Sequence, residues 1–402
     1  MWEQIRSNQT RSAILVAGMG VLLLLVGYFL GLYFFDSGIG GLIIALVVWG
    51  VMNLVAFFQG DNILLRLSRA KKISRDDYPR LYNVVEEMKI ASGLEKMPGI
   101  YIIDDPGLNA FATGRDPNKA AVAITSGLLQ KLNRDELQGV IGHEISHIKN
   151  RDVLLMAMSA VLLGTIVILA WYATRLLFFS GMARGRRSSS SGGGSAQLIV
   201  LAVGIVLIIL APIMAQFIYF AISRKREYLA DASSALYTRY PEGLASALGK
   251  LAASTSQLKS ANKATAPMYI INPFRKRGMA ASDLTSTHPP ISERIRILRS
   301  MAGGASFANY DQAYRQVHRA SAGVIVRSAL TTAEPVSIRA ATPEAREGEP
   351  DHIQRARDTS AVLWQLSSYR TITCACGTRL RVPPKFKQSK IKCPHCGRIN
   401  PV

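Results

Sequence analysis

Long runs of uncharged apolar residues constrain this chain more than any other feature. Ala13–Phe35 contains no charged residue over 23 positions, and Gly38–Phe58 forms a second run after only two residues. Helices of this length cross the roughly 30 Å hydrocarbon core of a bilayer. The first run is too long for the apolar core of a signal peptide and is not followed by a small-residue cleavage site, so we expect it to be retained. Two further runs, Val153–Thr174 and Ala196–Ser223, bring the predicted number of membrane spans to four.

The distribution of basic residues orients these predicted spans. Five basic residues follow the second run: Arg66, Arg69, Lys71, Lys72 and Arg75. The positive-inside rule places that end in the cytoplasm, although three arginines in the Gly/Ser-rich loop 180–195 then lie outside, against the rule. Lys+Arg 48 against Asp+Glu 27 gives a net charge of +21, which favours lipid headgroups or nucleic acid as partners. Because four spans are predicted, we favour the lipid bilayer over nucleic acid.

Between the second and third runs, the chain has the pattern of a soluble α/β domain. Apolar residues recur at helical spacing in Tyr78–Leu94, while Gly99–Ile103 and Ala121–Thr125 have the composition of short strands. The stretch 104–118 is rich in turn-forming residues and is expected to be a loop. The predicted organisation is therefore a series of six parts: 1–59 (two spans), 60–152 (first catalytic part), 153–223 (two spans), 224–301 (second catalytic part), 302–370 (mixed helix and disordered linker) and 371–402 (zinc ribbon).

An HExxH motif lies on a helix whose start is marked by its own capping residues. Asn133 and, three residues later, Glu136 form a capping pattern. The motif HEISH follows at 143–147. Its two histidines, His143 and His147, are four residues apart, so both imidazoles point from one face of a helix and can bind one zinc ion.

The glutamate of the motif, Glu144, directly follows the first histidine. A carboxylate in this position can hold a water molecule and take its proton, and zinc lowers the pKa of such a water towards about 7. HExxH alone also occurs by chance, so the motif needs a third ligand to support a catalytic metal site.

A candidate third ligand follows the fourth apolar run. Glu227 lies in the sequence REYLADA, and Asp231 is one helical turn later on the same face. This pair suits a zinc ligand and a carboxylate that orients a zinc-bound histidine. Exactly two predicted spans separate His147 from Glu227, so both emerge on the same side of the membrane. The alternative, in which Glu227 pairs with Arg224 or Arg226 at the membrane surface, is less favoured once HExxH is considered.

Five stretches of the chain match, in order, those of one peptidase family. They are LNAFATG (108–114), AVAITSGLL (121–129), GHEISHIKNRD (142–152), REYLADASSA (226–235) and THPPISERIRIL (287–298). In these stretches the chain resembles the HtpX-like membrane zinc metallopeptidases, which are related to the CaaX prenyl protease. The resemblance covers roughly residues 1–300. It implies a mainly α integral membrane protein with an α/β zincin-like (gluzincin) catalytic domain.

The same resemblance implies a role for each matched site residue. The implied zinc ligands are His143, His147 and Glu227, and the implied general base is Glu144. The implied carboxylate beside a zinc-bound histidine is Asp231. His288 and Arg294, in HPPISER, would stabilise the oxyanion, a role that requires fixed donors near the developing charge.

The resemblance also implies an edge that binds an extended substrate. Asn109, Ala110 and the strand Ala121–Thr125 are the implied residues. Pairing along an exposed strand would hold a polypeptide through its backbone without demanding a particular sequence. The alternative is an ordinary edge strand that a neighbouring loop covers.

All four cysteines lie in the last thirty residues: Cys374, Cys376, Cys393 and Cys396. Two close pairs separated by a hairpin-length segment are typical of a zinc ribbon, in which four thiolates bind a structural zinc. His395 can replace one cysteine in principle. The surrounding lysines and arginines are best interpreted as a solvated basic face.

Together these patterns predict a membrane-anchored zinc endopeptidase with its catalytic domain and C-terminus in the cytoplasm, in the cell's inner membrane. One catalytic and one structural zinc ion are expected. As the resemblance suggests, its polypeptide substrates would be membrane or misfolded proteins, in protein quality control. Two alternatives remain: a CaaX-type processing protease, and a catalytically inactive membrane scaffold that acts through its zinc ribbon.

Overall fold

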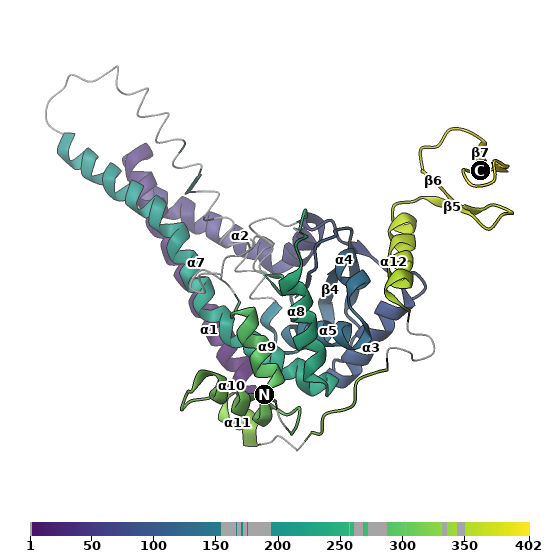
Figure 1. Cartoon of the computed structure of the whole chain (residues 1–402). Helices are drawn as coiled ribbons and strands as arrows, with labels where there is room; N and C mark the ends of the chain where they lie inside the picture. Colours follow the sequence, from purple (N-terminus) through teal and green to yellow (C-terminus); the bar gives the residue numbers. More distant parts are fainter. Residues whose placement is uncertain are drawn as a thin grey trace.

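The computed structural model describes residues 2–153, 194–256, 258–260, 268–271, 288–301, 303–331, 336–343 and 350–402, together with residues 166, 170, 171 and 175. Long apolar helices form an arm that projects from a domain of shorter helices around a small sheet (Figure 1). A cysteine-containing module follows at the C-terminus, on the other side of that domain from α1 (Figure 1).

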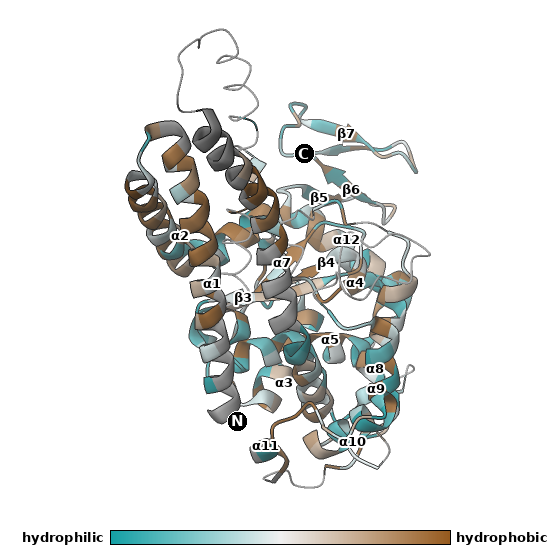
Figure 2. Ribbon diagram, turned by 90° about the vertical axis from the view of Figure 1, so that its left-hand side faces the viewer, coloured by the Kyte–Doolittle hydropathy of each residue, from teal (hydrophilic) through white to brown (hydrophobic). Residues whose placement is uncertain are grey.

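Three long helices form the arm: α1 (Trp2–Phe35), α2 (Gly38–Leu67) and α7 (Gly194–Thr238). Hydrophobic residues predominate along the coloured parts of these helices, whereas the rest of the molecule is mixed (Figure 2). Within the described residues, α2 is the helix that is both long and apolar enough to cross a bilayer, and α1 contains a shorter apolar stretch, Val16–Leu32. Large apolar side chains of α2, such as Ile39 and Leu54, are more than half exposed, as expected for a surface in contact with lipid.

Glycines allow α1 and α2 to pack closely as a hairpin. Gly31 lies against Gly41, and a Cβ atom added to Gly41 would lie 2.1 Å from the carbonyl oxygen of Gly27. Small residues at such positions let membrane helices approach backbone to backbone. The turn is stabilised by Ser37, whose hydroxyl accepts the backbone N–H of Gly40.

The predicted first, second and fourth apolar runs lie in α1, α2 and α7. The predicted third run, Val153–Thr174, and the Gly/Ser-rich loop 180–195 fall almost entirely outside the described residues.

The sheet has four strands in the order β1-β2-β4-β3. These are β1 (Lys71–Lys72), β2 (Gly99–Ile103), β4 (Ala120–Thr125) and β3 (Ala110–Gly114). β2 and β4 are parallel, and the two outer pairings are antiparallel. The predicted strands at β2 and β4 are confirmed.

Two expectations about the sheet are wrong. The stretch predicted as a loop, 104–118, contains β3, because a central neighbour supplies the pairing that its Ala-rich sequence does not signal. The strand Ala121–Thr125, predicted to be a substrate-binding edge, pairs on both sides, with β2 and β3. The edge strands of the sheet are therefore β3 and, on the other side, β1.

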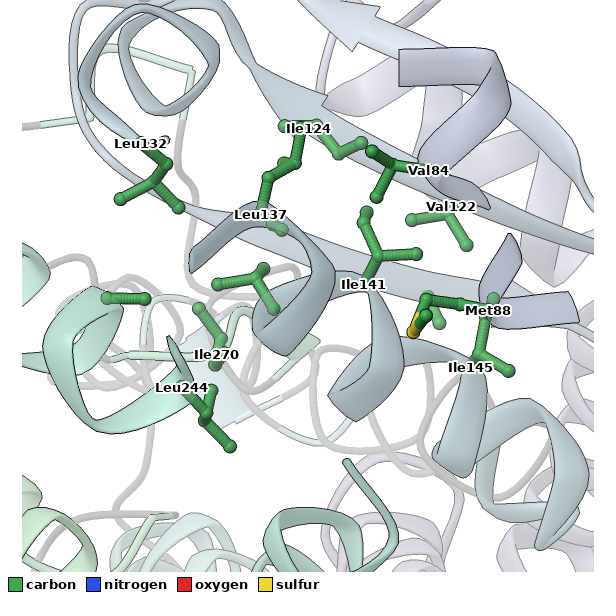
Figure 3. Close-up of a cluster of buried hydrophobic side chains, with 14 of the residues drawn as sticks. Val84, Met88, Val122, Ile124, Leu132, Leu137, Ile141, Ile145, Leu244 and Ile270 are labelled. Carbon is green, nitrogen blue, oxygen red and sulfur yellow. The ribbon is translucent and has the colours of Figure 1, made fainter. Parts of the chain in front are cut away.

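Helices pack on the sheet and enclose one hydrophobic core. They include α3 (Pro79–Ser92), α4 (Ser126–Lys131), α5 (Arg134–Lys149), α8 (Pro241–Ala253) and α9 (Ile291–Arg299). Side chains of α3, β4 and α5 meet in this core, among them Val84, Val122 and Ile141 (Figure 3). The predicted capping box is confirmed: Asn133 accepts the N–H of Glu136, and the Glu136 carboxylate accepts the N–H of Asn133. The core and the cap together fix the helix that carries HExxH.

The C-terminal quarter of the chain wraps around this domain. α10 (Phe307–His318) and α11 (Arg327–Thr331) are followed by the extended segment 336–343 and by α12 (His352–Leu366). The guanidinium of Arg339 and the backbone N–H of Thr342 both donate to the carboxylate of Asp135, at the start of α5. Residues 336–343, in a region predicted to be a disordered linker, are thus hydrogen-bonded to the catalytic domain.

Two small hairpins form the cysteine-containing module. They are β5 (Arg370–Thr373) with β6 (Arg379–Val382), and β7 (Lys390–Lys392) with β8 (Ile399–Pro401). The ammonium of Lys71, near the end of α2, donates to the carbonyl oxygen of Leu366 and so ties the start of the module to the sheet.

Candidate metal centre

Helix α5 presents both histidines of the HExxH motif to one point. The Nε2 atoms of His143 and His147 are 3.3 Å apart, and both side chains are buried. Their rings are almost perpendicular, with centroids 4.9 Å apart. This is the arrangement that the i, i+4 spacing predicts.

Helix α7 brings Glu227 to the same point from beyond the membrane arm. One carboxylate oxygen of Glu227 lies 3.6 Å from Nε2 of His143, and the other lies 3.5 Å from Nε2 of His147. The side chain of Glu227 is 2% exposed, so it does not form the surface pair with Arg224 or Arg226 that was the alternative. The predicted meeting of three side chains from two distant segments is thus present in the structure.

The geometry of these three groups fits a tetrahedral zinc ion. Ligands about 2.0–2.1 Å from a tetrahedral centre lie roughly 3.3 Å from one another. The observed separations of 3.3, 3.5 and 3.6 Å are close to that value. In addition, Oε2 of Glu144 is buried and has no hydrogen-bond partner among the described residues, as expected for a group that acts on a reactant.

Each histidine is oriented by a carboxylate on its other nitrogen. Nδ1 of His143 lies 3.0 Å from the carboxylate of Asp231, the residue expected beside a zinc-binding histidine. The side chain of Asp231 is fully buried. Nδ1 of His147 lies 3.4 Å from the carboxylate of Asp152, which is also fully buried. Such partners fix the ring orientation and tautomer of a metal-binding histidine.

Sequence reasoning did not assign Asp152 a role. It follows the end of α5, where Arg151 adopts a left-handed conformation (φ 58°). In the sequence, Asp152 is an acidic residue five positions after His147. Helix α5 ends between the two residues, so the i, i+4 spacing of a helix face does not connect them.

Glu144 lies in a dry environment beside the edge strand. Its side chain is 1% exposed, and burial raises the pKa of its carboxyl. The backbone N–H of Ala112 in β3 hydrogen-bonds to it and partly offsets that rise in pKa. A raised pKa suits a group that must both accept and return a proton near neutral pH.

The electrostatics of the ligands are strongly coupled. Burial lowers the pKa of His143, but hydrogen bonds to Asp231 and Glu227 outweigh it and raise that pKa to about 9. Burial likewise raises the pKa of Glu227, yet the charges of His288 and His143 hold it well below its usual range. The metal-free site therefore holds an anionic carboxylate against a protonated imidazole.

The two predicted oxyanion donors differ in their surroundings. The side chain of His288 is buried, and its Nδ1 lies 2.9 Å from the carboxylate of Glu227. The guanidinium of Arg294 is fully buried and donates twice to Asp231, at 2.7 and 2.8 Å, and once to the carbonyl oxygen of Ile270. Arg294 therefore supports Asp231, whereas His288 lies directly against the candidate zinc ligand Glu227.

The predicted substrate contacts at the start of β3 are engaged within the protein. The carbonyl oxygen of Ala110 accepts the N–H of Ile270 at 3.0 Å. The side-chain amide of Asn109 donates to the carbonyl oxygen of Ile271 at 2.9 Å. The structure therefore pairs both residues with residues 270 and 271.

The four cysteines form a second candidate metal site, remote from the first. The sulfurs of Cys374 and Cys396 are 3.6 Å apart, those of Cys376 and Cys393 are 3.7 Å apart, and all four lie within 4.8 Å of one another. Sulfurs about 2.3 Å from a tetrahedral zinc lie roughly 3.8 Å apart, so this set also fits zinc. A hydrogen bond with Thr378 lowers the pKa of Cys376 to about 5, which favours the thiolate that metal binding requires.

Comparison with known proteins agrees with this geometry. The model of the family "Peptidase family M48" matches residues 76–302, the region that contains both segments of the metal centre. The chain belongs to peptidase family M48. A protease HtpX homolog of Dictyoglomus turgidum is 46% identical over 300 residues, covering 75% of this chain and 94% of the relative. A protease HtpX homolog of Streptococcus pneumoniae (strain Hungary19A-6) is 42% identical over 301 residues, covering 75% of this chain and all of the relative.

Among solved structures, the crystal structure of S. mikatae Ste24p matches with a TM-score of 0.39 and 21% identity, covering 74% of this chain and 67% of that one. The M48 match and the HtpX relatives confirm the family resemblance, and the chain is a membrane-anchored metalloprotease. The family model ends at residue 302, so α10 to the cysteine module lies outside the M48 region.

Proposed function

We propose that this M48 protease hydrolyses peptide bonds at a zinc ion held by His143, His147 and Glu227. The observation that carries the proposal is the set of separations between the three ligand atoms, which fits one tetrahedral ion. When bound there, zinc supplies Lewis-acid chemistry, which polarises the scissile carbonyl and makes the attacking water more acidic.

The residues of the chain carry the proton transfers. Glu144 takes a proton from the attacking water as its oxygen bonds to the carbonyl carbon. It then delivers that proton to the nitrogen that leaves when the C–N bond breaks. The imidazole of His288 is the candidate donor to the developing oxyanion, since its Nδ1 lies 2.9 Å from the carboxylate of the candidate ligand Glu227. Asp231 and Asp152 hold the ligand rings, and Arg294 holds Asp231.

The test of these roles is the variant Glu144→Gln in the full chain. We expect zinc to stay bound and cleavage of an unfolded protein such as casein to fall at least about 10²-fold, the size of a general-base contribution. Glu95→Gln, an exposed glutamate on the same domain, is the control and should cleave normally. Cleavage by Glu144→Gln at the control rate would remove Glu144 from the mechanism.

We further propose four membrane spans, with the metal centre and the C-terminus on the cytoplasmic side. The third ligand, Glu227, lies on α7, which continues from the arm into the catalytic domain. An even number of spans between α5 and Glu227 is required for the two segments to meet. Cysteines introduced at the exposed positions Arg151 and Lys225 should both be labelled from the cytoplasmic side. Labelling from opposite sides would exclude the shared metal.

The proposed substrates are polypeptides from membrane or misfolded proteins, because the candidate ligand Glu227 lies on α7, the helix that joins the catalytic domain to the membrane arm. A CaaX-type processing role predicts that a farnesylated peptide is cleaved faster than its unmodified counterpart. We expect no such preference.

The scaffold alternative predicts no cleavage by the wild type, and it accounts poorly for a buried base beside a complete ligand set. The cysteine module is proposed to bind a second, structural zinc.

A further inference from the structure

Helices α5 and α7, which carry the candidate zinc ligands, pack antiparallel and are joined at intervals of about one helical turn. The linked pairs are His147–Glu227, His143–Asp231, Gly139–Ser234 and Asp135–Thr238. A step of four residues towards the start of α5 is matched by a step of three or four residues towards the end of α7, as expected for two helices that face each other along their length. The metal centre is therefore one end of a longer contact between the two helices.

In the middle of this contact, the two helices meet directly. The hydroxyl of Ser234 on α7 donates to the carbonyl oxygen of Gly139 on α5 at 2.7 Å. A Cβ atom added to Gly142 would lie 3.2 Å from the same hydroxyl oxygen, so α5 has little room to move towards α7 at this point.

The pair furthest from the metal centre is joined by a side chain from elsewhere in the chain. Arg339 lies in residues 336–343, here called the strap, and its guanidinium reaches both helices. Nε donates to the carbonyl oxygen of Thr238 at 2.9 Å, while Nη2 donates to the carboxylate of Asp135 at 2.7 Å and to the side-chain oxygen of Gln138 at 2.9 Å. Because a guanidinium is planar and rigid, these donors fix the distance between the start of α5 and the end of α7.

The strap is itself held at this position. The backbone N–H of Arg339 donates to the carbonyl oxygen of Arg239, and the guanidinium of Arg239 donates to the hydroxyl of Ser337 at 2.7 Å. Thr342 donates to the carboxylate of Asp135 through both its N–H and its hydroxyl. Asp135 is 6% exposed, and a carboxylate so deeply buried requires such donors. The strap thus compensates a buried charge at the start of the HExxH helix.

The strap lies outside the M48 region, whereas the candidate ligands lie inside it. Asp135 precedes His143 by eight residues, or about 12 Å along α5, and Thr238 follows Glu227 by eleven residues, or about 16 Å along α7. Helices are rigid elements that carry a displacement from one end to the other. A shift between the two helix ends at Arg339 is therefore also a shift between Glu227 and the two histidines.

We propose that Arg339 is a positioning residue of the metal centre. It sets the register of α5 against α7 and so the separation of the three zinc ligands. Through this residue, a segment beyond the M48 region contributes to the geometry of the M48 site. The inference rests on the proposed zinc site and its ligands.

The test compares Arg339→Ala with Arg355→Ala in the full-length protein in lipid nanodiscs. Arg355 also lies beyond the M48 region, but it donates to the carbonyl oxygen of Gln130 on α4 rather than to α5 or α7. All proteins, including the parent, carry Cys374→Ser, so that zinc at the cysteine module does not contribute. Zinc affinity is measured by competition with a chelator, and kcat and KM are measured for casein.

For Arg339→Ala we expect zinc affinity to fall about fivefold, the size of one lost hydrogen bond. Because small misplacements of catalytic groups are costly, kcat should fall about tenfold, while KM changes less than about twofold. Arg355→Ala should keep zinc affinity and kcat within about twofold of the parent, even where its melting temperature falls by the same amount. Equal zinc affinity and kcat in the two variants would overturn the proposal.

A conservative variant separates the bridge from the charge. Arg339→Lys keeps a positive charge beside Asp135, but a single ammonium does not reproduce the planar fork that reaches both helices. We expect Arg339→Lys to resemble Arg339→Ala in zinc affinity and kcat. Parent-like values would show that charge alone suffices, and the bridging role would be wrong.

Two further measurements keep these outcomes distinct. The melting temperature identifies a variant that is unfolded in the assay, and Arg339→Lys then takes the place of Arg339→Ala in the comparison. A parent that binds no zinc or cleaves nothing, or a Glu144→Gln variant that still cleaves, refutes the catalytic assignment instead.

Discussion

Replacement of Asp231 by asparagine tests how the metal centre is supported. Asp231 is fully buried and accepts two hydrogen bonds from Arg294, at 2.7 and 2.8 Å, while its carboxylate lies 3.0 Å from Nδ1 of His143. Asparagine has nearly the same shape and can still accept from the imidazole. It removes the negative charge, however, and leaves the buried guanidinium without its main counter-ion.

The expected size of the effect follows from this burial. Removal of one partner of a buried ion pair costs about 3–5 kcal/mol in the free energy of unfolding, because the remaining charge stays out of water. Loss of an orienting carboxylate weakens metal binding about 10- to 100-fold. The pair Arg299–Glu242 provides the contrast, since its side chains are 55% and 43% exposed. Glu242→Gln should cost about 0–1 kcal/mol and leave zinc binding unchanged.

The assay is denaturant unfolding of the zinc-free protein, with zinc affinity measured separately by competition with a chelator. The double variant Asp231→Leu/Arg294→Met should be less destabilised than Asp231→Asn, because it removes both charges rather than one. An Asp231→Asn protein that matches Glu242→Gln in both stability and zinc affinity would refute the role assigned to this pair.

Three further results are expected. Asp152→Asn should weaken zinc binding about 10- to 100-fold, as measured by chelator competition, since it orients His147; an unchanged affinity would contradict that role. Because the pKa of His143 is raised to about 9 and zinc binds only the neutral ring, zinc affinity should increase about tenfold per pH unit from pH 6 to 8 and level off above pH 9. A dissociation constant independent of pH, determined by the same competition, would show that no proton is displaced. Cys374→Ser should lower the zinc content, measured by metal analysis, from two ions per chain to one, and casein cleavage should persist. Loss of both ions would show that the two sites are not independent.

The sequence predicted the metal centre well because local and topological rules both applied to it. The i, i+4 spacing placed His143 and His147 on one helical face, and the capping box at Asn133 located that helix. Glu227 was reached from the count of apolar runs between it and His147, without any knowledge of the fold. These inferences depend on periodicity and chain direction, which a single sequence contains.

The features that sequence analysis missed depend on tertiary pairing. β3 has no strong strand signal, and only its position beside β4 makes it an edge. Asp152 reaches His147 because a left-handed residue ends α5, a geometry that spacing does not reveal. The contact between Asn109 and Ile271 joins residues 162 positions apart. His318 on α10 lies 2.9 Å from Glu293 on α9, another contact that spacing along the chain does not reveal.

The continuity of α7 gives the metal centre a direct mechanical link to the bilayer. The helix runs from Gly194 to Thr238 and contains both the predicted fourth span and Glu227, which lies about 6 Å along the axis from Ser223. The two histidines belong to a different, shorter helix. A bilayer thicker or thinner than the span changes the tilt of α7 and moves one ligand relative to the other two. Lipid thickness would in this way tune how well the peptidase holds its metal.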